Sequence, residues 1–166
     1  MLALLTGAFL LGCSTSSPWK EVAILNDDPD YELVKLTYSA DNLFNGIELE
    51  LTRYGNAIRG YLNANRYSFP MNEKDPQHIG VAISSERGNQ RFLAERFEGG
   101  QRLRLPEQAV THLIETLMEN FAVTIRCGYF KQMLLPDQFH RHYQTLVMGP
   151  PSFLSKERVN IEWATK

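Results

Sequence analysis

The sequence lacks the features that mark most enzymes and nucleic-acid-binding proteins. It contains no Gly-rich phosphate loop, no nucleophile-elbow motif, no zinc-protease helix motif and no closely spaced cysteine pair. Charge of one sign is not in excess either, because 17 Lys and Arg residues stand against 19 Asp and Glu residues. Without a basic surplus we expect no nucleic-acid partner. The missing motifs favour a protein without catalytic activity, although a site assembled from distant residues would leave no such motif.

The composition is that of one folded domain. Of the 166 residues, 43% are hydrophobic and 22% are charged, which differs from the apolar-poor, highly charged profile of disordered chains. The length suits a single domain, because domains cluster at roughly 100 to 150 residues. No internal repeat and no second domain boundary is evident in the sequence.

The first 12 residues, MLALLTGAFLLG, carry no charged side chain. They are too few to cross a hydrocarbon core, which needs about 20 residues, but they match the apolar region of a signal peptide. The residues Leu10-Leu11-Gly12-Cys13 resemble the lipobox of bacterial lipoproteins. This resemblance covers only the first 13 residues. It implies that the Cys13 sulfur receives a diacylglycerol, that the preceding peptide bond is cut and that the new amino group is acylated, for example with palmitate.

The resemblance also implies where the protein resides. Several acyl chains together hold a protein on a bilayer, so Cys13 is expected to tether the domain to a membrane. In such lipoproteins an Asp after the cysteine favours the inner membrane, but here the residue is Ser14. The implied location is therefore the outer membrane, facing the periplasm. A plasma-membrane lipoprotein is the alternative. Signal peptides begin with a basic region, yet no Lys or Arg precedes Lys20, so we expect the true start upstream of Met1.

Residues 21–166 are predicted to form one globular domain after a signal peptide (1–12) and a tether (13–20). Alternation of apolar and polar residues predicts strands, most clearly in a hairpin around the Gly55-Asn56 turn. The fold class is therefore α+β, mainly antiparallel, with seven to nine strands in a sheet or sandwich. The predicted strands cover about residues 33–38, 47–52, 57–63, 79–84, 91–97, 103–105, 123–127, 129–135 and 159–163.

A change to helical periodicity predicts one long amphipathic helix at about residues 106–120, with Pro106 in its first turn. A membrane-surface helix would carry Lys and Arg on its polar face, and this helix has none there. The apolar stripe is therefore predicted to pack on the sheet. Pro136-Asp137 predicts a shorter helix at about 136–146. The stripe of the long helix consists of Val110, Leu113, Ile114, Leu117, Met118 and Phe121.

Candidate chemical groups are few. Cys127, the only cysteine besides Cys13, ends an apolar alternation and is predicted to be a buried strand residue rather than a nucleophile. His140 and His142 are the only close pair of metal-type ligands, but on a helix this spacing points them about 200° apart. The other two histidines, His78 and His112, have no evident partner. We predict no catalytic, metal or cofactor site; the one assigned site residue is Cys13, for lipid attachment.

Three further clusters allow two interpretations each. Glu48 and Glu50 share one strand face and are either a glycosidase-like carboxylate pair or a solvated face, which their alternation with leucines favours. The acidic stretch 26–30 is either a calcium site or a solvated turn, and its proline favours the turn. Three tyrosines either line a ligand face or pack across strands: Tyr54, Tyr61 and Tyr67.

These observations lead to three hypotheses about function. The first is a lipid-anchored envelope protein with a non-catalytic role, which binds another envelope protein in assembly or as an accessory subunit. The tether favours it, because confinement to a membrane raises the effective concentration for neighbours there. The second is a carrier of a small apolar ligand or lipid, which requires an apolar cavity between helix and sheet. The third is a hydrolase whose histidines converge with an acidic or nucleophilic group.

Overall fold

The computed structural model describes residues 17–24 and 33–148, which form one curved antiparallel sheet and two helices. Within these residues the strand order is β1-β2-β3-β4-β7-β6-β5-β8-β9. The helices are α1 (Glu107–Met118) and α2 (Phe139–Met148). The strands are β1 (Trp19–Ile24), β2 (Leu33–Tyr38), β3 (Ile47–Tyr54), β4 (Ala57–Ala64), β5 (His78–Ser85), β6 (Gly88–Arg96), β7 (Arg102–Arg104), β8 (Val123–Cys127) and β9 (Phe130–Leu134).

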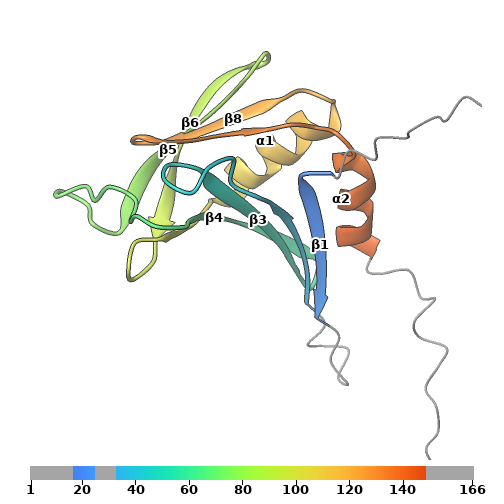
Figure 1. Cartoon of the computed structure of the whole chain (residues 1–166), viewed down its shortest axis with the longest axis horizontal. Coiled ribbons are helices and arrows are strands. Elements are labelled where there is room, and N and C mark those ends of the chain that lie inside the picture. Colours follow the sequence, from blue (N-terminus) through green and yellow to red (C-terminus); the bar gives the residue numbers. More distant parts are fainter. Residues whose placement is uncertain (1–16, 25–32, 149–166) are drawn as a thin grey trace, which may run out of the picture.

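The sheet curls so that the free edge of β9 meets the segment between β2 and β3. The Lys131 amide donates to the Asn45 carbonyl (3.0 Å), and the Asp41 amide donates to the side-chain oxygen of Gln132 (2.9 Å). Figure 1 shows β1, β3 and β4 in one wall and β5, β6 and β8 in the other, with α1 between them. The first of these contacts occupies a backbone amide of β9, an edge strand whose free backbone groups would otherwise offer a template for another chain.

The core lies inside this curve. Each strand turns alternate side chains inward, and the inner faces of the two walls meet the buried side of α1. The buried residues of α1 are Ala109, Val110, Leu113, Thr116 and Leu117. Helix α1 contacts β4, β5 and β8, whereas α2 contacts β1, β2 and β3. The predicted helix-on-sheet packing is thus confirmed, as is the mainly antiparallel α+β class.

Gly60 permits the close approach of α1 to β4. A Cβ atom at this position would lie 2.8 Å from Val110 Cγ2, a distance that real side chains do not adopt. The Gly60 carbonyl accepts a hydrogen bond from the Leu105 amide (2.9 Å), so the chain just before the helix is also fixed to this strand. An isolated glycine inside a strand often marks such a backbone approach.

The hairpins agree with the sequence predictions, but the helix limits differ. Helix α1 begins at Glu107 and ends at Met118, because Pro106 is its N-cap and Asn120 has a left-handed φ of 66°. Phe121 therefore lies outside the helix. The second helix was expected at 136–146 and instead begins at Phe139, after a turn in which the Phe139 amide donates to the Pro136 carbonyl.

The N-terminal part of the described chain differs from the prediction. Strand β1 begins at Trp19, inside the stretch 13–20 predicted to be a tether, because the Trp19 side chain is buried against Tyr38 and Phe139. The strand predicted at 159–163 lies outside the described residues, as does the lipobox. The described strands form one sheet rather than the two sheets of a sandwich. Neither described helix is long and apolar enough to cross a membrane.

Candidate functional site

A groove lies between α1 and the start of β4. It has a volume of about 660 Å³. Helix α2 closes one end with Tyr143, and the end of β7 borders the other with Arg104. Its walls therefore come from elements far apart in the sequence. The residues that line it are Asn56, Ala57, Ile58, Arg59, Arg104, Leu105, Pro106, Glu107, Val110, Thr111, Ile114, Glu115 and Tyr143.

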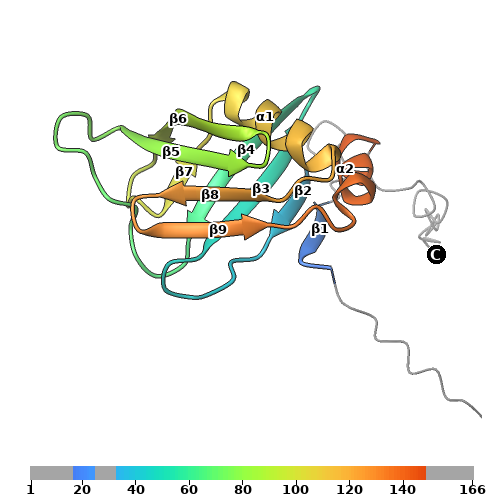
Figure 2. The same ribbon diagram turned by 90° about the horizontal axis from the view of Figure 1, so that it is seen from above.

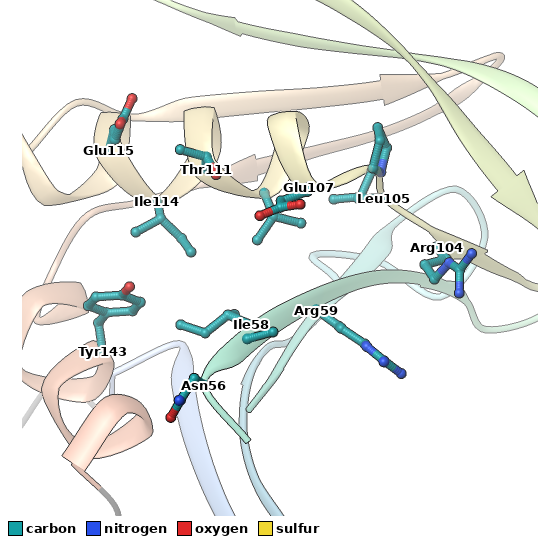
Figure 3. A pocket seen from close by; sticks show the side chains of 13 residues that line it. Asn56, Ile58, Arg59, Arg104, Leu105, Glu107, Thr111, Ile114, Glu115 and Tyr143 are labelled. Carbon is teal, nitrogen blue, oxygen red and sulfur yellow. The ribbon is translucent and has the colours of Figure 1, made fainter. Parts of the chain in front are cut away.

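The middle of the groove is apolar. Ile58, Ile114 and Tyr143 are only partly buried, and they pack against the edge of the core. Figure 3 shows Ile58 and Ile114 directed toward Tyr143 across the groove, whereas Glu115 points away from its centre. Burial raises the pKa of the Tyr143 phenol, so this hydroxyl stays protonated and is able to donate a hydrogen bond.

Charged side chains flank the apolar part. Arg59 and Arg104 lie together at the end opposite Tyr143 (Figure 3). The Arg59 guanidinium stacks over the Tyr54 ring, 4.7 Å from its centroid, and Arg104 pairs with Glu95 at 2.5 Å. These partners orient the two cations without burying them. The groove thus offers hydrophobic contact in its middle and ionic contact at its rim, which is the arrangement of a binding site for a segment with both kinds of side chain.

The four histidines do not gather at one place, and three of them have separate partners. His78 faces Asp75, three residues earlier, at 3.1 Å, and His112 of α1 lies 3.4 Å from the Gln90 amide nitrogen. His140 is exposed. His142 Nδ1 lies 2.6 Å from Glu21 Oε1, and this contact joins α2 to β1. In residues 17–24 and 33–148, no three His, Cys, Asp or Glu side chains gather as a metal site would require.

His140 and His142 both lie on α2, as the helical interpretation of their spacing predicted. Only His142 has a carboxylate partner, Glu21, and the sequence analysis missed this pairing because the two residues are 121 positions apart.

Glu50 is the clearest correction to the sequence analysis. Its carboxylate was expected on a solvated face, but the residue is only 7% exposed. Burial alone would raise the pKa of Glu50; the hydrogen bond and charge of Arg102 and the charge of Lys35 outweigh it and lower the pKa below its usual value. Arg102 Nη2 donates to Glu50 Oε1 at 2.8 Å, and Thr52 donates to the same oxygen. This carboxylate is therefore held ionised and is unsuited to act as a general acid.

Glu48 has a different partner from Glu50. It accepts a hydrogen bond from the Asn63 amide at 3.2 Å. The tyrosines also separate: Tyr61 stacks under Arg102, with 4.0 Å between the guanidinium carbon and the ring centroid, whereas Tyr54 and Tyr67 are exposed. They do not line one common ligand face.

Cys127 is fully buried on the inner face of β8, as predicted. Burial raises the pKa of its thiol to about 12, so the thiolate that a nucleophile requires is not formed near neutral pH. Cys13, Ser14 and the acidic stretch 26–30 lie outside the described residues.

The sequence analysis did not find the groove. Its residues come from β4, β7, α1 and α2, and none of them forms a motif. One signal was available, because Gly60 interrupts a predicted strand and indicates close approach of another backbone. Comparison with protein-family models, with curated proteins and with solved structures gave no match.

Proposed function

We propose that this protein is a lipid-anchored protein of the cell envelope whose domain binds a segment of another envelope protein without catalysing a reaction. The observation that carries the proposal is the groove between α1 and β4, about 660 Å³ in volume, with an apolar middle and a charged rim. The lipobox-like residues ending at Cys13 supply the proposed anchor, and the outer membrane, facing the periplasm, is its proposed location. An anchored domain meets its membrane neighbours at a raised effective concentration.

The chemistry of the groove favours a polypeptide over a small apolar ligand. Carriers enclose most of the ligand surface in a largely apolar pocket. This groove is open along one side, and Arg59, Arg104 and Glu107 border it. A peptide segment with apolar and charged side chains can contact both parts of the lining, whereas a purely apolar ligand contacts only the middle. The histidines do not converge on one site, since three of them have separate partners and His140 is exposed, so a hydrolase has less support than binding in the groove.

The proposal is tested by crosslinking in the native envelope. A photoreactive amino acid replaces Thr111, which is exposed in the groove, in the full-length protein; the control replaces Arg91, which is exposed on β6 away from the groove. We expect one envelope protein to be captured from position 111 and not from position 91. Ile114→Glu should abolish this capture, because it places a charge in the apolar middle of the groove.

Mass spectrometry of the same material tests the anchor. The proposal predicts a new N-terminus at Cys13 that carries diacylglycerol and an acyl group, and Cys13→Ser should remove this modification. An unmodified Cys13 would overturn the proposed anchor, and equal capture from positions 111 and 91 would overturn the proposed binding groove.

A further inference from the structure

Three loops meet at the end of the sheet that is opposite to the groove. They are the β2–β3 segment (39–46), the β4–β5 segment (65–77) and the β8–β9 turn (128–129). The Arg66 guanidinium lies over the Phe44 ring at 5.4 Å, and Tyr129 donates from its hydroxyl to the Ser68 carbonyl at 3.5 Å. The three loops therefore form one continuous surface, which we call the loop surface.

The loop surface exposes large hydrophobic side chains from every one of its loops. Each of them has more than half of its surface exposed, although large apolar side chains are mostly buried in folded proteins. A concentration of such residues marks a contact surface. They are Leu43 (58%), Phe44 (59%), Tyr67 (51%), Met71 (58%) and Tyr129 (59%).

The loop that carries Leu43 and Phe44 is held in a defined conformation. The Asn42 side-chain oxygen accepts hydrogen bonds from the amides of Phe44 and Asn45, both at 2.9 Å. A Cβ atom at Gly46 would lie 2.3 Å from the Asn42 carbonyl oxygen, so only glycine fits there. The loop thus presents its two apolar side chains on a fixed turn, which reduces the entropy lost when they are bound.

Strand register places the start of the described chain near this surface. Trp19 pairs with Tyr38, Tyr38 with Leu49 and Leu49 with Leu62, so the four residues form one row across the sheet. Tyr38 is the last residue of β2, directly before the loop 39–46. The Trp19 indole also donates to the Leu135 carbonyl (2.9 Å), which follows the end of β9 away from the β8–β9 turn, so Trp19 lies at the Tyr38 edge of the loop surface. Figure 2 shows the start of β1, the β2–β3 segment and β9 along the same side of the molecule.

The proposed anchor then fixes the orientation of the domain. Cys13 precedes Trp19 by six positions, a stretch that spans at most about 20 Å when fully extended. An anchored domain would therefore be held with its loop end close to the bilayer. The groove begins at Ala57, and β4 runs from there to Ala64 at the loop surface, a distance of about 23 Å at 3.3 Å per residue. The groove would face away from the membrane.

We infer that the loop surface lies on the lipid bilayer and inserts Phe44, Leu43 and Tyr129 into its interfacial layer. This inference rests on the proposed lipid anchor. The side-chain chemistry fits a bilayer interface, where Tyr places its ring among acyl chains and its hydroxyl among headgroups. Arg66 and Lys131 are available beside the apolar residues for lipid phosphates.

The test attaches the anchor chemically, so that its outcome does not depend on lipidation in cells. The chain from Cys13 onward is coupled through the Cys13 thiol to a maleimide phospholipid in vesicles of phosphatidylethanolamine and phosphatidylglycerol. Cys127 does not react, because it is fully buried. Brominated lipids then quench tryptophans that enter the bilayer. The probes are Phe44→Trp and Tyr129→Trp, and the control is Tyr54→Trp at the far end of β3, which is 65% exposed. Quenching of the parent protein, which contains Trp19 and Trp163, is subtracted.

We expect strong quenching at positions 44 and 129 and none at position 54. Equal quenching at 44 and 54 would overturn the inferred orientation, and so would the absence of quenching at both 44 and 129. Crosslinking of position 44 to a protein in native membranes, without quenching by brominated lipid, would also overturn it and would assign the loop surface to a protein partner. If Cys13 is unmodified in cells but the coupled protein shows the expected pattern, the proposed anchor fails while the surface keeps its affinity for lipid.

Discussion

The two faces of the sheet at strands β3, β4 and β7 differ in what they bury. The inner face is covered by the core, whereas the outer face buries Glu50 and Thr52 among residues that are partly or fully exposed. The inner face carries Leu51, Leu62 and Leu103, none of which has exposed surface, and packs against α1. The outer face holds Glu50, which Arg102 and Lys35 neutralise. The inner face is stabilised by removal of hydrocarbon from water, which does not depend on pH, whereas the outer face depends on charges.

A charged residue that alternates with leucines need not be exposed to solvent. Glu50 is covered because Lys35 of β2 lies on one side and Arg102 and Tyr61 lie on the other. A buried ion pair gains less than its Coulomb attraction, because desolvation opposes it. We therefore expect the inner face to contribute more to stability than the outer face.

The largest effect is expected from truncation of the inner face. Leu51→Ala should lower the free energy of unfolding by about 2–5 kcal/mol, because it removes buried methyl groups and leaves a cavity. The loss should be the same at pH 5 and pH 8, as measured by urea unfolding. Leu93→Ala on β6 is the matched control, since Leu93 is 66% exposed, and it should change stability by less than about 0.5 kcal/mol. A Leu51→Ala effect as small as that of Leu93→Ala would show that the inner face is not the main source of stability.

An intermediate effect is expected where α1 meets the inner face. Gly60→Ala should cost about 1–3 kcal/mol, because the new methyl group would overlap Val110 and push the helix from β4. Gly80→Ala is the control on β5, where nothing lies within 4 Å of the new methyl group. It should be neutral or stabilising by up to about 1 kcal/mol, because alanine restricts the unfolded chain. Thermal unfolding of both variants checks the difference, and equal melting temperatures would contradict the close packing of α1 on β4.

A smaller, pH-dependent effect is expected on the outer face. Glu50→Gln should cost about 1–2 kcal/mol at pH 7, because it leaves Arg102, which keeps 36% of its side chain exposed, without its carboxylate partner. Glu48→Gln on the same face should cost less than about 1 kcal/mol, since Glu48 is half-buried and loses one hydrogen bond from Asn63. Urea unfolding of the two variants measures the difference.

The sign of the pH dependence follows from the lowered pKa of Glu50. The native state holds this carboxylate ionised. Its contribution to folding stability is therefore complete at a pH above the ordinary pKa of glutamate, and it is lost as the pH falls through the lowered pKa of Glu50. The slope from this one group is at most about 1.4 kcal/mol per pH unit. Glu50→Gln should therefore reduce the acid-induced loss of stability between pH 5 and pH 3. An unchanged slope would show that Arg102 and Glu50 are not coupled in solution.

Several elements were predictable because their signals are local. The turn at Gly55-Asn56 and the alternation in β8 that buries Cys127 follow from residues close in sequence. The apolar stripe predicted for α1 is buried in part, at Val110, Leu113 and Leu117, whereas its Met118 is 36% exposed. The helix limits were less accurate. The ends of α1 are set by backbone conformation, at the extended Pro106 N-cap and at Asn120 with its left-handed φ, and not by the periodicity of the side chains.

The candidate site could not be predicted in the same way. Tyr143 reaches the groove only because α2 packs against the β1–β3 wall, where Arg53 donates to the Val147 carbonyl and His142 contacts Glu21. The loop surface likewise needs three loops from different parts of the chain. The sequence shows Leu43, Phe44 and Tyr129 as apolar residues in turns, but not that their turns touch.

The sequence by itself determined the mainly antiparallel α+β class and the inward face of most strands. Apolar residues that recur every two residues share one face of a strand, and those that recur every 3.6 residues share one face of a helix, and burial favours that face. Only the tertiary structure decided which polar residues are covered, where the groove opens and which loops share a surface. Those outcomes depend on the curl of the sheet, which brings together backbone and side-chain groups that no local pattern relates.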